Sequence, residues 1–282
     1  MSGVWRALTA DELTGGAKHE AAPFGRFTPN AVQRMLIAIG KKSVLKRGVF
    51  RGSYTGLILA LSKGPLDILF RGCAYRIWGE NNLIEYGLLL NPDYNHMDLD
   101  FLLQDAPLSA NFVDMGSNIG LYSQPMAKAG YKGKTISIDA NPLMAARLMF
   151  NATASGLKNL TMVSAAVSDT DGQGSLVIRK DDVAIVAVDE SADGKIPIRT
   201  LKAVLDEHEV TEIHGLKIDI EGHEDKALVP FLMNAPKTRL PKKIVIEHPT
   251  PDADYPGCAQ AFLKLNYKLV GRSRNNSFYE LI

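Results

Sequence analysis

The sequence has only two cysteines among its 282 residues, Cys73 and Cys258. Two cysteines are too few for a disulfide framework or a cysteine-rich metal centre, so apolar burial has to hold the fold together. Long hydrophobic runs are absent as well. The richest stretch, Leu57–Leu61, is far shorter than the roughly twenty apolar residues that cross a bilayer. We therefore expect no transmembrane segment.

Neither sign of charge dominates, since 32 Lys and Arg balance 31 Asp and Glu and the formal net charge is +1. Such a balance gives no global attraction to nucleic acid or to membranes. The N-terminus carries Asp11 and Glu12 early and has no apolar core of the length of a secretory signal. We expect a cytoplasmic protein with one large core and at most a small appendage.

The stretch from Asn111 to Gln124 organises the rest of the sequence. A short apolar strand, Phe112–Val113, runs into Gly116 and Gly120, and a helical pattern follows. An α/β sheet holds a nucleotide with this order of strand, glycine-rich turn and helix. Glycine lets a ligand approach the main chain, and the free amides at the start of the helix bind anions.

The spacing of these glycines argues against a dinucleotide site, and hence against a dehydrogenase. They run G-x-x-x-G rather than G-x-G-x-x-G, and Asp114 stands two residues before the first of them. The Asp114 carboxylate would repel a pyrophosphate, but it suits a positively charged ligand such as S-adenosylmethionine, which carries an ammonium and a sulfonium. A plain structural turn is the alternative until a second element agrees.

A second element does agree. Thr135–Ile138 reads as the next strand and stops at Asp139, close to the spacing of roughly twenty residues from Gly116 that places an acid on the ribose hydroxyls. A carboxylate accepts two hydrogen bonds, and a ribose diol offers two donors. Asn141 and Pro142 then begin a helix as its N-cap and first residue.

The remaining periodicity completes an α/β pattern. Helices are expected at 84–90, 97–103, 201–207 and about 259–265. A third strand is expected at 160–163 and 165–167, a closing antiparallel hairpin at 267–270 and 277–281, and extra antiparallel strands at 174–179, 184–188 and 196–199.

The first 80 residues predict a small β-rich lobe. After an amphipathic helix over 29–39, the expected strands are 44–45, 49–50, 57–61, 68–70 and 75–78. Residues 21–76 hold ten Lys or Arg and one acid, Asp67. This excess favours an anionic group, such as a phosphate-bearing acceptor or a lipid headgroup, with plain solvated loops as the alternative. Nucleic acid is disfavoured because the few aromatics show no stacking pattern.

A second segment that carries candidate catalytic side chains is Leu216–Glu224. Side chains alternate along a strand, so Lys217, Asp219 and Glu221 share one direction, and His223 lies at the following turn. The carboxyl ends of strands border the ligand crevice of an open α/β sheet, which makes these acids candidates for work on a cofactor or an acceptor. The alternative is an internal ion pair between Lys217 and one acid.

The strand Lys243–Glu247 repeats this pattern, because it ends in an acid and is followed by His248. Four groups that can move a proton, Asp219, His223, Glu247 and His248, are therefore expected near one crevice.

Together these segments resemble the FkbM-type family of S-adenosylmethionine-dependent methyltransferases. The resemblance covers about residues 80–282, and the L-K-I-D-I-E-G-x-E segment at 216–224 is its most specific part. The family usually has Ala where Ser117 stands, a change of one small residue for another. The matching segments are Val113–Gly120, Ser137–Pro142, Ala166–Asp169, Arg199–Leu201, Leu216–Glu224 and Ile246–His248.

The resemblance implies a class I, Rossmann-like methyltransferase domain in residues 81–282, with a mostly parallel seven-stranded sheet and an antiparallel C-terminal hairpin. Residues 1–80 would form an N-terminal extension and the lobe. It further implies methyl transfer, typically to a hydroxyl of a sugar, glycolipid or secondary metabolite. On the family's pattern, the residues near the cofactor would be Asp114, Gly116, Asn118 and Gly120 for the methionine part, Asp139 for the ribose, and Ala140 and Ala166 for the adenine.

For the chemistry, we expect Asp219 or Glu221 to orient the acceptor and His223 or His248 to accept its proton. Two carboxylates at neighbouring strand ends would instead suit a Mg²⁺ ion that polarises the hydroxyl. The alternatives are methylation of RNA or protein, and a non-catalytic module that binds an anionic partner through the basic lobe. Planar nitrogen acceptors are disfavoured because no Asn-Pro-Pro-aromatic loop follows the fourth strand. The sequence does not specify an oligomeric state.

Overall fold

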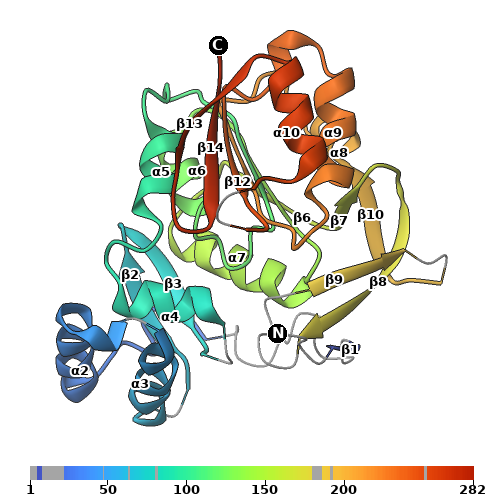
Figure 1. The fold of residues 1–282 in the computed structure, drawn as a ribbon. Helices are drawn as coiled ribbons and strands as arrows, with labels where there is room; N and C mark the ends of the chain where they lie inside the picture. Colours follow the sequence, from blue (N-terminus) through green and yellow to red (C-terminus); the bar gives the residue numbers. More distant parts are fainter. Residues whose placement is uncertain are drawn as a thin grey trace.

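The computed structural model describes residues 5–7, 22–46, 48–62, 64–79, 82–179, 186–190, 193–250 and 253–282. A seven-stranded sheet with helices on both faces forms its centre (Figure 1). In spatial order the strands are β13 (Tyr267–Arg272), β14 (Asn276–Leu281), β12 (Lys243–Glu247), β11 (Gly215–Ile218), β4 (Phe112–Met115), β5 (Thr135–Asp139) and β6 (Leu160–Ser164).

The sheet is parallel from β12 to β6, and β14 and β13 add an antiparallel hairpin at one edge. Strand β4 lies between β5 and β11, so the chain leaves β4 toward one side of the sheet and later returns on its other side. Ligands of open α/β sheets bind at such a point of reversal, outside the carboxyl ends of the strands. The predicted fold class of the main domain, a mostly parallel seven-stranded sheet with a closing hairpin, is confirmed.

Each face of the sheet buries its own core, because successive side chains of a strand point to opposite sides. Val113 packs in one core and Phe112 in the other, and both are fully buried. The first core is covered by α8 (Leu201–Glu207), α9 (Glu224–Asn234) and α10 (Pro256–Lys264). The second is covered by α4 (Leu83–Leu90), α5 (His96–Leu103), α6 (Ser123–Ala129) and α7 (Pro142–Ala154).

A second sheet lies beside the first (Figure 1). It consists of β1 (Trp5–Ala7), β7 (Ala166–Ser168), β8 (Gly172–Arg179), β9 (Val186–Glu190) and β10 (Ile196–Thr200). The extra strands expected over 174–179 and 196–199 are present, and the part of 184–188 that lies within the described residues belongs to β9. The expected third strand divides at Ala165, so that β6 stays in the main sheet and β7 joins the second sheet.

The N-terminal lobe is more helical than the sequence predicts. It contains α2 (Ala31–Lys42), the short 3-10 helix η1 (Val44–Lys46), α3 (Gly48–Ala60) and one hairpin of β2 (Leu66–Phe70) and β3 (Cys73–Ile77). The strands expected over 44–45, 49–50 and 57–61 are wrong, because 44–45 lies in η1 and the other two fall on α3 or its end. Phe50, Leu57 and Leu61 recur at helical spacing, and the intervening glycines do not interrupt the helix.

The lobe is fixed to the main sheet by buried polar contacts. Within the lobe, Asp67 on β2 and Arg76 on β3 form an ion pair of 2.7 Å in which both side chains are 1% exposed. The Arg76 amide donates to Asn151 Oδ1 on α7 (2.9 Å), and the Tyr75 hydroxyl donates to the carbonyl of Gly120 (3.1 Å). The lobe therefore lies directly against the glycine turn. Within the described ranges, no helix is long and apolar enough to cross a membrane.

Candidate active site

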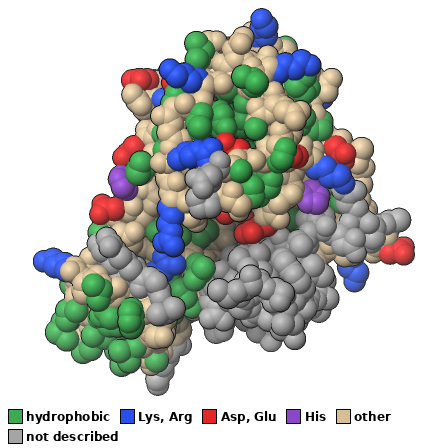
Figure 2. Space-filling model, in the orientation of Figure 1, with side chains coloured by type: hydrophobic (Ala, Val, Ile, Leu, Met, Phe, Trp, Pro, Cys, Tyr) green, Lys and Arg blue, Asp and Glu red, His purple; other side chains and the backbone are tan. Residues whose placement is uncertain are grey.

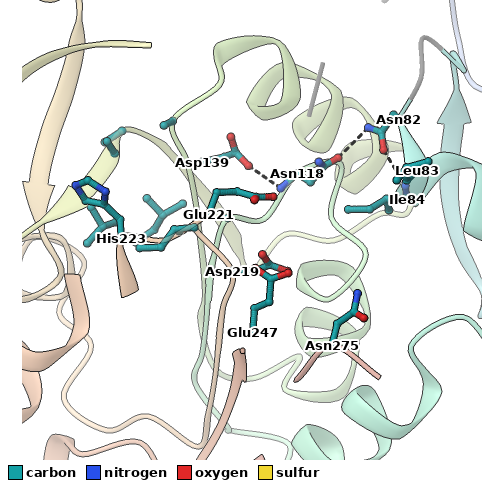
Figure 3. A pocket seen from close by; sticks show the side chains of 17 residues that line it. Asn82, Leu83, Ile84, Asn118, Asp139, Asp219, Glu221, His223, Glu247 and Asn275 are labelled. Carbon is teal, nitrogen blue, oxygen red and sulfur yellow. Dashed lines mark hydrogen bonds between the residues drawn. The ribbon is translucent and has the colours of Figure 1, made fainter. Parts of the chain in front are cut away.

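A cavity of about 270 Å³ opens at the carboxyl ends of β4, β5, β11 and β12. Figure 3 shows acidic and amide side chains around it. Of the site residues predicted from the sequence, those that line the cavity are Gly116, Asn118, Asp139, Ala140, Ala166, Asp219, Glu221, His223 and Glu247. Asp114, Gly120 and His248 are not among the lining residues.

The glycine turn packs tightly against the end of β11. Gly116 has a φ of +78°, and a Cβ placed on it would lie 1.8 Å from the carbonyl oxygen of Asp219. The amides of Gly116 and Ser117 donate to the carbonyl of Ile138 at 2.9 and 3.1 Å. Glycine is thus required at position 116 both for its backbone angles and for the close approach of two strand ends.

We predict that Gly116→Ala lowers the free energy of unfolding by about 2 to 3 kcal/mol, because the methyl group adds a steric clash to the cost of a positive φ. Gly156 is the matched control, since its φ is +70° and a Cβ placed on it would have no atom within 4 Å. Gly156→Ala should cost about 1 kcal/mol. Urea denaturation of both variants measures the difference, and equal losses would contradict the tight packing.

Asp139 ends β5 with its carboxylate held at the cavity. The amide of Asn118 donates to its Oδ2 (2.7 Å) and the amide of Asn141 to its Oδ1 (2.8 Å). Burial raises the pKa of Asp139 to about 6, against the lowering effect of these two hydrogen bonds. Each oxygen has a second lone pair, so the carboxylate can accept two further hydrogen bonds from a diol.

Asp114 and Gly120 lie behind the lining of the cavity. Asp114 is fully buried and accepts a short hydrogen bond from the Ser123 hydroxyl through Oδ2. Its Oδ1 has no partner among the described residues, and burial raises its pKa to about 6. Gly120 has a φ of +93°, and its carbonyl accepts the hydroxyl of Tyr75. Asp114 is therefore a buried acceptor with one oxygen unsatisfied, and Gly120 joins the turn to the lobe.

One apolar part of the lining comes from the ends of β5 and β7 and from the loop after β11. Its residues are Ile138, Ala140, Ala165, Ala166, Val167 and Ile220. Small side chains at three of these positions leave room for a flat ring. A planar base can pack here while its sugar lies at Asp139, which is the arrangement that a nucleoside needs.

Two carboxyl groups meet at the ends of β11 and β12. The parallel register pairs Ile218 with Ile246, so the residues that follow them, Asp219 and Glu247, are neighbours (Figure 3). Burial, the charge of Asp219 and a hydrogen bond with it raise the pKa of Glu247 to about 9. Two carboxyl groups this close therefore favour one bound proton over two negative charges.

Lys217 forms the internal ion pair that the sequence left as an alternative. Its ammonium lies 3.3 Å from Asp219 Oδ2 and donates to Asn276 Oδ1 (3.0 Å) and to the carbonyl of Ile218 (2.9 Å). Lys217 is 1% exposed, whereas the side chain of Asp219 is 35% exposed. The buried lysine thus holds one side of the Asp219 carboxylate, while the other side of that carboxylate remains accessible from the cavity.

The loop after β11 is folded by Glu224, which accepts the amides of Ile220 and Gly222, both at 2.9 Å. Glu221, between them, has a φ of +56°, a conformation that is rare for a residue with a side chain. Such residues cluster at functional sites. The loop aims Glu221 toward Asn118, and His223 lies at the far end of the cavity from Asp219 and Glu247 (Figure 3).

His248 follows Glu247 but does not line the cavity. It is buried, and its amide donates to the carbonyl of Asn275 (3.0 Å) in the turn of the closing hairpin. The expected convergence of four proton-moving groups is thus reduced to Asp219, Glu247 and His223 at the cavity wall.

Sequence reasoning missed one wall of the cavity. Asn82, Leu83 and Ile84 line it from the start of α4, and Asn275 lines it from the closing hairpin. Asn82 caps α4 and donates through Nδ2 to Asn118 Oδ1 (3.1 Å). An Asn before an apolar helical run does indicate a cap, but nothing in the sequence places that cap against the glycine turn. Among the residues with described positions, no three His, Cys, Asp or Glu side chains are grouped to hold a metal ion.

Fold and site together define a class of enzyme. A parallel sheet with β4 between β5 and β11, an antiparallel strand inserted beside β12, and a glycine turn followed by an acid at the end of β5 are the plan of class I S-adenosylmethionine-dependent methyltransferases. Residues 114–269 match the model of the methyltransferase FkbM domain. This match spans more than half of the chain, so the protein belongs to the FkbM methyltransferase family.

Solved structures of methyltransferases resemble this chain at low identity. M. jannaschii TYW2 in complex with AdoMet is 14% identical over 78% of this chain and 88% of that chain, with a TM-score of 0.42. Precorrin-6y C5,15-methyltransferase from Geobacter metallireducens is 11% identical over 67% and 86%, with a TM-score of 0.42. M. capricolum TrmK with S-adenosyl-homocysteine is 10% identical over 65% and 66%, with a TM-score of 0.40. A comparison with curated protein sequences gives no significant match.

Proposed function

We propose that this methyltransferase acts on a hydroxyl oxygen of a sugar, a glycolipid or a secondary metabolite. The observation that carries the proposal is the pair of carboxyl groups of Asp219 and Glu247, which lie side by side at the cavity wall. A carboxylate accepts hydrogen bonds from hydroxyls and can take up their proton, which suits an alcohol acceptor.

The residues of the cavity fit S-adenosylmethionine, which supplies an electrophilic methyl group when it is bound. Asp139 would accept both ribose hydroxyls, and Ala140 and Ala166, which line the cavity, would lie against the adenine. Gly116 and Asn118 would lie along the methionine part. Gly120 supports this turn from behind, and the unsatisfied Oδ1 of Asp114 is an acceptor for an ammonium group.

On the acceptor side, Asp219 is our choice for the proton acceptor. The raised pKa of Glu247 favours its protonated form, and the Lys217 ammonium holds the Asp219 carboxylate in place at 3.3 Å. Glu221 would orient a second hydroxyl of the acceptor. His223 is the alternative base, although it stands apart from the carboxyl pair (Figure 3). His248 would act only if its side chain turned toward the cavity.

A Mg²⁺ ion is the second possible arrangement for the same acids. Asp219 and Glu247 end neighbouring strands, and carboxylate oxygens are the ligands that Mg²⁺ prefers. The ion would replace the proton on Glu247. Turnover measured after chelation by EDTA, with Mg²⁺ added back, separates the two arrangements: full activity in EDTA excludes the metal.

We predict that affinity for S-adenosylmethionine rises as the pH increases from 5 to 7. The pKa values of Asp114 and Asp139 are about 6 in the free protein, so both carboxyls lose their charge as the pH falls through 6. A positively charged ligand favours the ionised form, hence binding weakens on the acid side. Calorimetric titration across this range measures the effect. Asp114→Asn should reduce the slope, leaving the part that Asp139 contributes, and an unchanged profile would remove Asp114 from the site.

The acceptor class is tested by transfer of a labelled methyl group to separate pools of glycans, glycolipids, RNA and protein. We expect label in a carbohydrate or lipid fraction, as an ether that resists mild base. Label in RNA or protein alone would replace the proposal with the other acceptor class. Binding of the cofactor without transfer to any pool would favour a non-catalytic module.

A further inference from the structure

The N-terminal lobe exposes apolar side chains that methyl transfer does not use. We call them the apolar face: Val32, Met35 and Ile39 on α2, with Phe50, Leu57 and Leu61 on or just after α3, each between 44% and 60% exposed. Scattered exposed apolar residues are ordinary, but a group of this size on one element pair marks an interaction surface.

The two helices that carry these side chains are packed together. Gln33 Nε2 donates to the carbonyl of Ile58 (2.9 Å), and the Tyr54 hydroxyl donates to the carbonyl of Leu36 (2.8 Å), so α2 and α3 are held together. On each helix the exposed apolar residues recur at helical spacing and form one stripe. Figure 2 shows hydrophobic side chains gathered over the lobe that carries α2 and α3 in Figure 1.

The same segment of the chain is strongly positive. Residues 21–76 contain ten Lys or Arg and one acid, Asp67. Asp67 is buried in its ion pair with Arg76, so it places no negative charge on the surface. Arg34 and Lys42 on α2 are exposed. A second copy of the chain docked by two-fold symmetry would bring these like charges together, whereas an anionic surface would complement them.

We propose that the apolar face and its basic surroundings form a docking surface for an anionic phospholipid bilayer. Helices with one apolar side and a basic polar side lie in the plane of the interface and bury the apolar side at the boundary between headgroups and acyl chains. Basic residues add attraction to anionic lipids. Helix α4 packs on both α2 and α3 and begins at Asn82 in the cavity wall. The docking surface is thereby joined to the active site through one helix.

The test is sedimentation of the full chain with vesicles of phosphatidylcholine alone and of phosphatidylcholine mixed with phosphatidylglycerol. We expect binding to the mixed vesicles that weakens as salt is added. Met35→Ser with Phe50→Ser should weaken it at least about tenfold, because two inserted side chains are lost. Lys42→Gln should weaken it about fivefold. A second, independent variant of the apolar face, Val32→Ser with Ile39→Ser, should also weaken binding to the mixed vesicles.

Matched controls come from the C-terminal part of the chain, outside the N-terminal lobe. Leu263 on α10 is 80% exposed and Lys268 on β13 is exposed, so Leu263→Ser and Lys268→Gln should leave vesicle binding unchanged. The affinity of each variant for S-adenosylmethionine is measured as well, because an unchanged affinity shows that the variant is folded.

Three results would overturn the proposal. They are no sedimentation with mixed vesicles, equal sedimentation with both kinds of vesicle, or binding that survives both serine pairs. Analytical ultracentrifugation adds a fourth: a dimer that the serine pairs dissociate would make the face a contact between copies.

Discussion

Asp219→Asn is expected to reduce kcat by about 10²- to 10⁴-fold, the usual contribution of a positioned base. The amide cannot take the acceptor's proton, although it keeps the shape of the side chain. Lys217 retains its bonds to Asn276 and to the carbonyl of Ile218, so the fold should persist. Affinity for S-adenosylmethionine should change by less than about threefold, since Asp219 is assigned to the acceptor side. Single-turnover kinetics and calorimetry measure the two quantities.

Companion variants decide how the carboxyl pair works. Burial and the charge of Asp219 raise the pKa of Glu247, so Glu247→Gln should mimic the protonated form of this side chain and cost less than about tenfold in kcat. If the pair instead held Mg²⁺, this change would remove a ligand, and activity would fall with EDTA as well. A larger loss in Glu221→Gln than in Asp219→Asn would transfer the role of base to Glu221. Unchanged turnover in His223→Ala would remove histidine from the mechanism.

Asp139→Asn is expected to weaken binding of S-adenosylmethionine by about 10²- to 10³-fold. The Asp139 carboxylate accepts two backbone amides and retains capacity for two ribose hydroxyls. An asparagine has one acceptor oxygen, so its NH₂ group would face either the Asn118 or the Asn141 amide, donor against donor. Hydrogen bonds to a charged group contribute about 1.5 to 3 kcal/mol each, which sets the size of the loss.

A matched acid at another strand end serves as the control. Asp169 follows β7 and lies outside the cavity lining, so Asp169→Asn should leave the affinity unchanged. Calorimetric titration with S-adenosylmethionine and with adenosine separates the ribose contact from contacts with the methionine part. Asp139→Asn should weaken the binding of both ligands by a similar factor, because both contain the ribose. Wild-type affinity in Asp139→Asn would exclude Asp139 as the ribose acceptor.

The strands of the main sheet could be predicted because each is a short apolar run between polar turns. Their order was not specified by these runs and came from the family resemblance. In the N-terminal lobe, such apolar runs led to wrong predictions of strands. Short apolar runs such as 57–61 fit a strand or a buried helix equally well, and the contacts of α3 with α2 and α4 decide for helix.

The strand-end acids were also visible in the sequence, but their roles depend on neighbours. Lys217 and Asp219 are two residues apart on one strand, and their ion pair could be foreseen. From the sequence alone, Glu247 and His248 are equally good candidates for the cavity, because both lie at the end of the same strand. In the structure the β12 register places Glu247 beside Asp219 in the cavity lining, whereas His248 is buried outside that lining and its amide binds the carbonyl of Asn275.

The sequence by itself determined the glycine turn, the acid that follows the next strand and the family, because these depend on residues close together in the chain. Only the tertiary structure decided that Glu247 lies beside Asp219 and that Asn82 closes the cavity against Asn118. These contacts join residues 28 and 36 positions apart. Such distances are set by strand register and helix packing, which no local pattern of residues encodes.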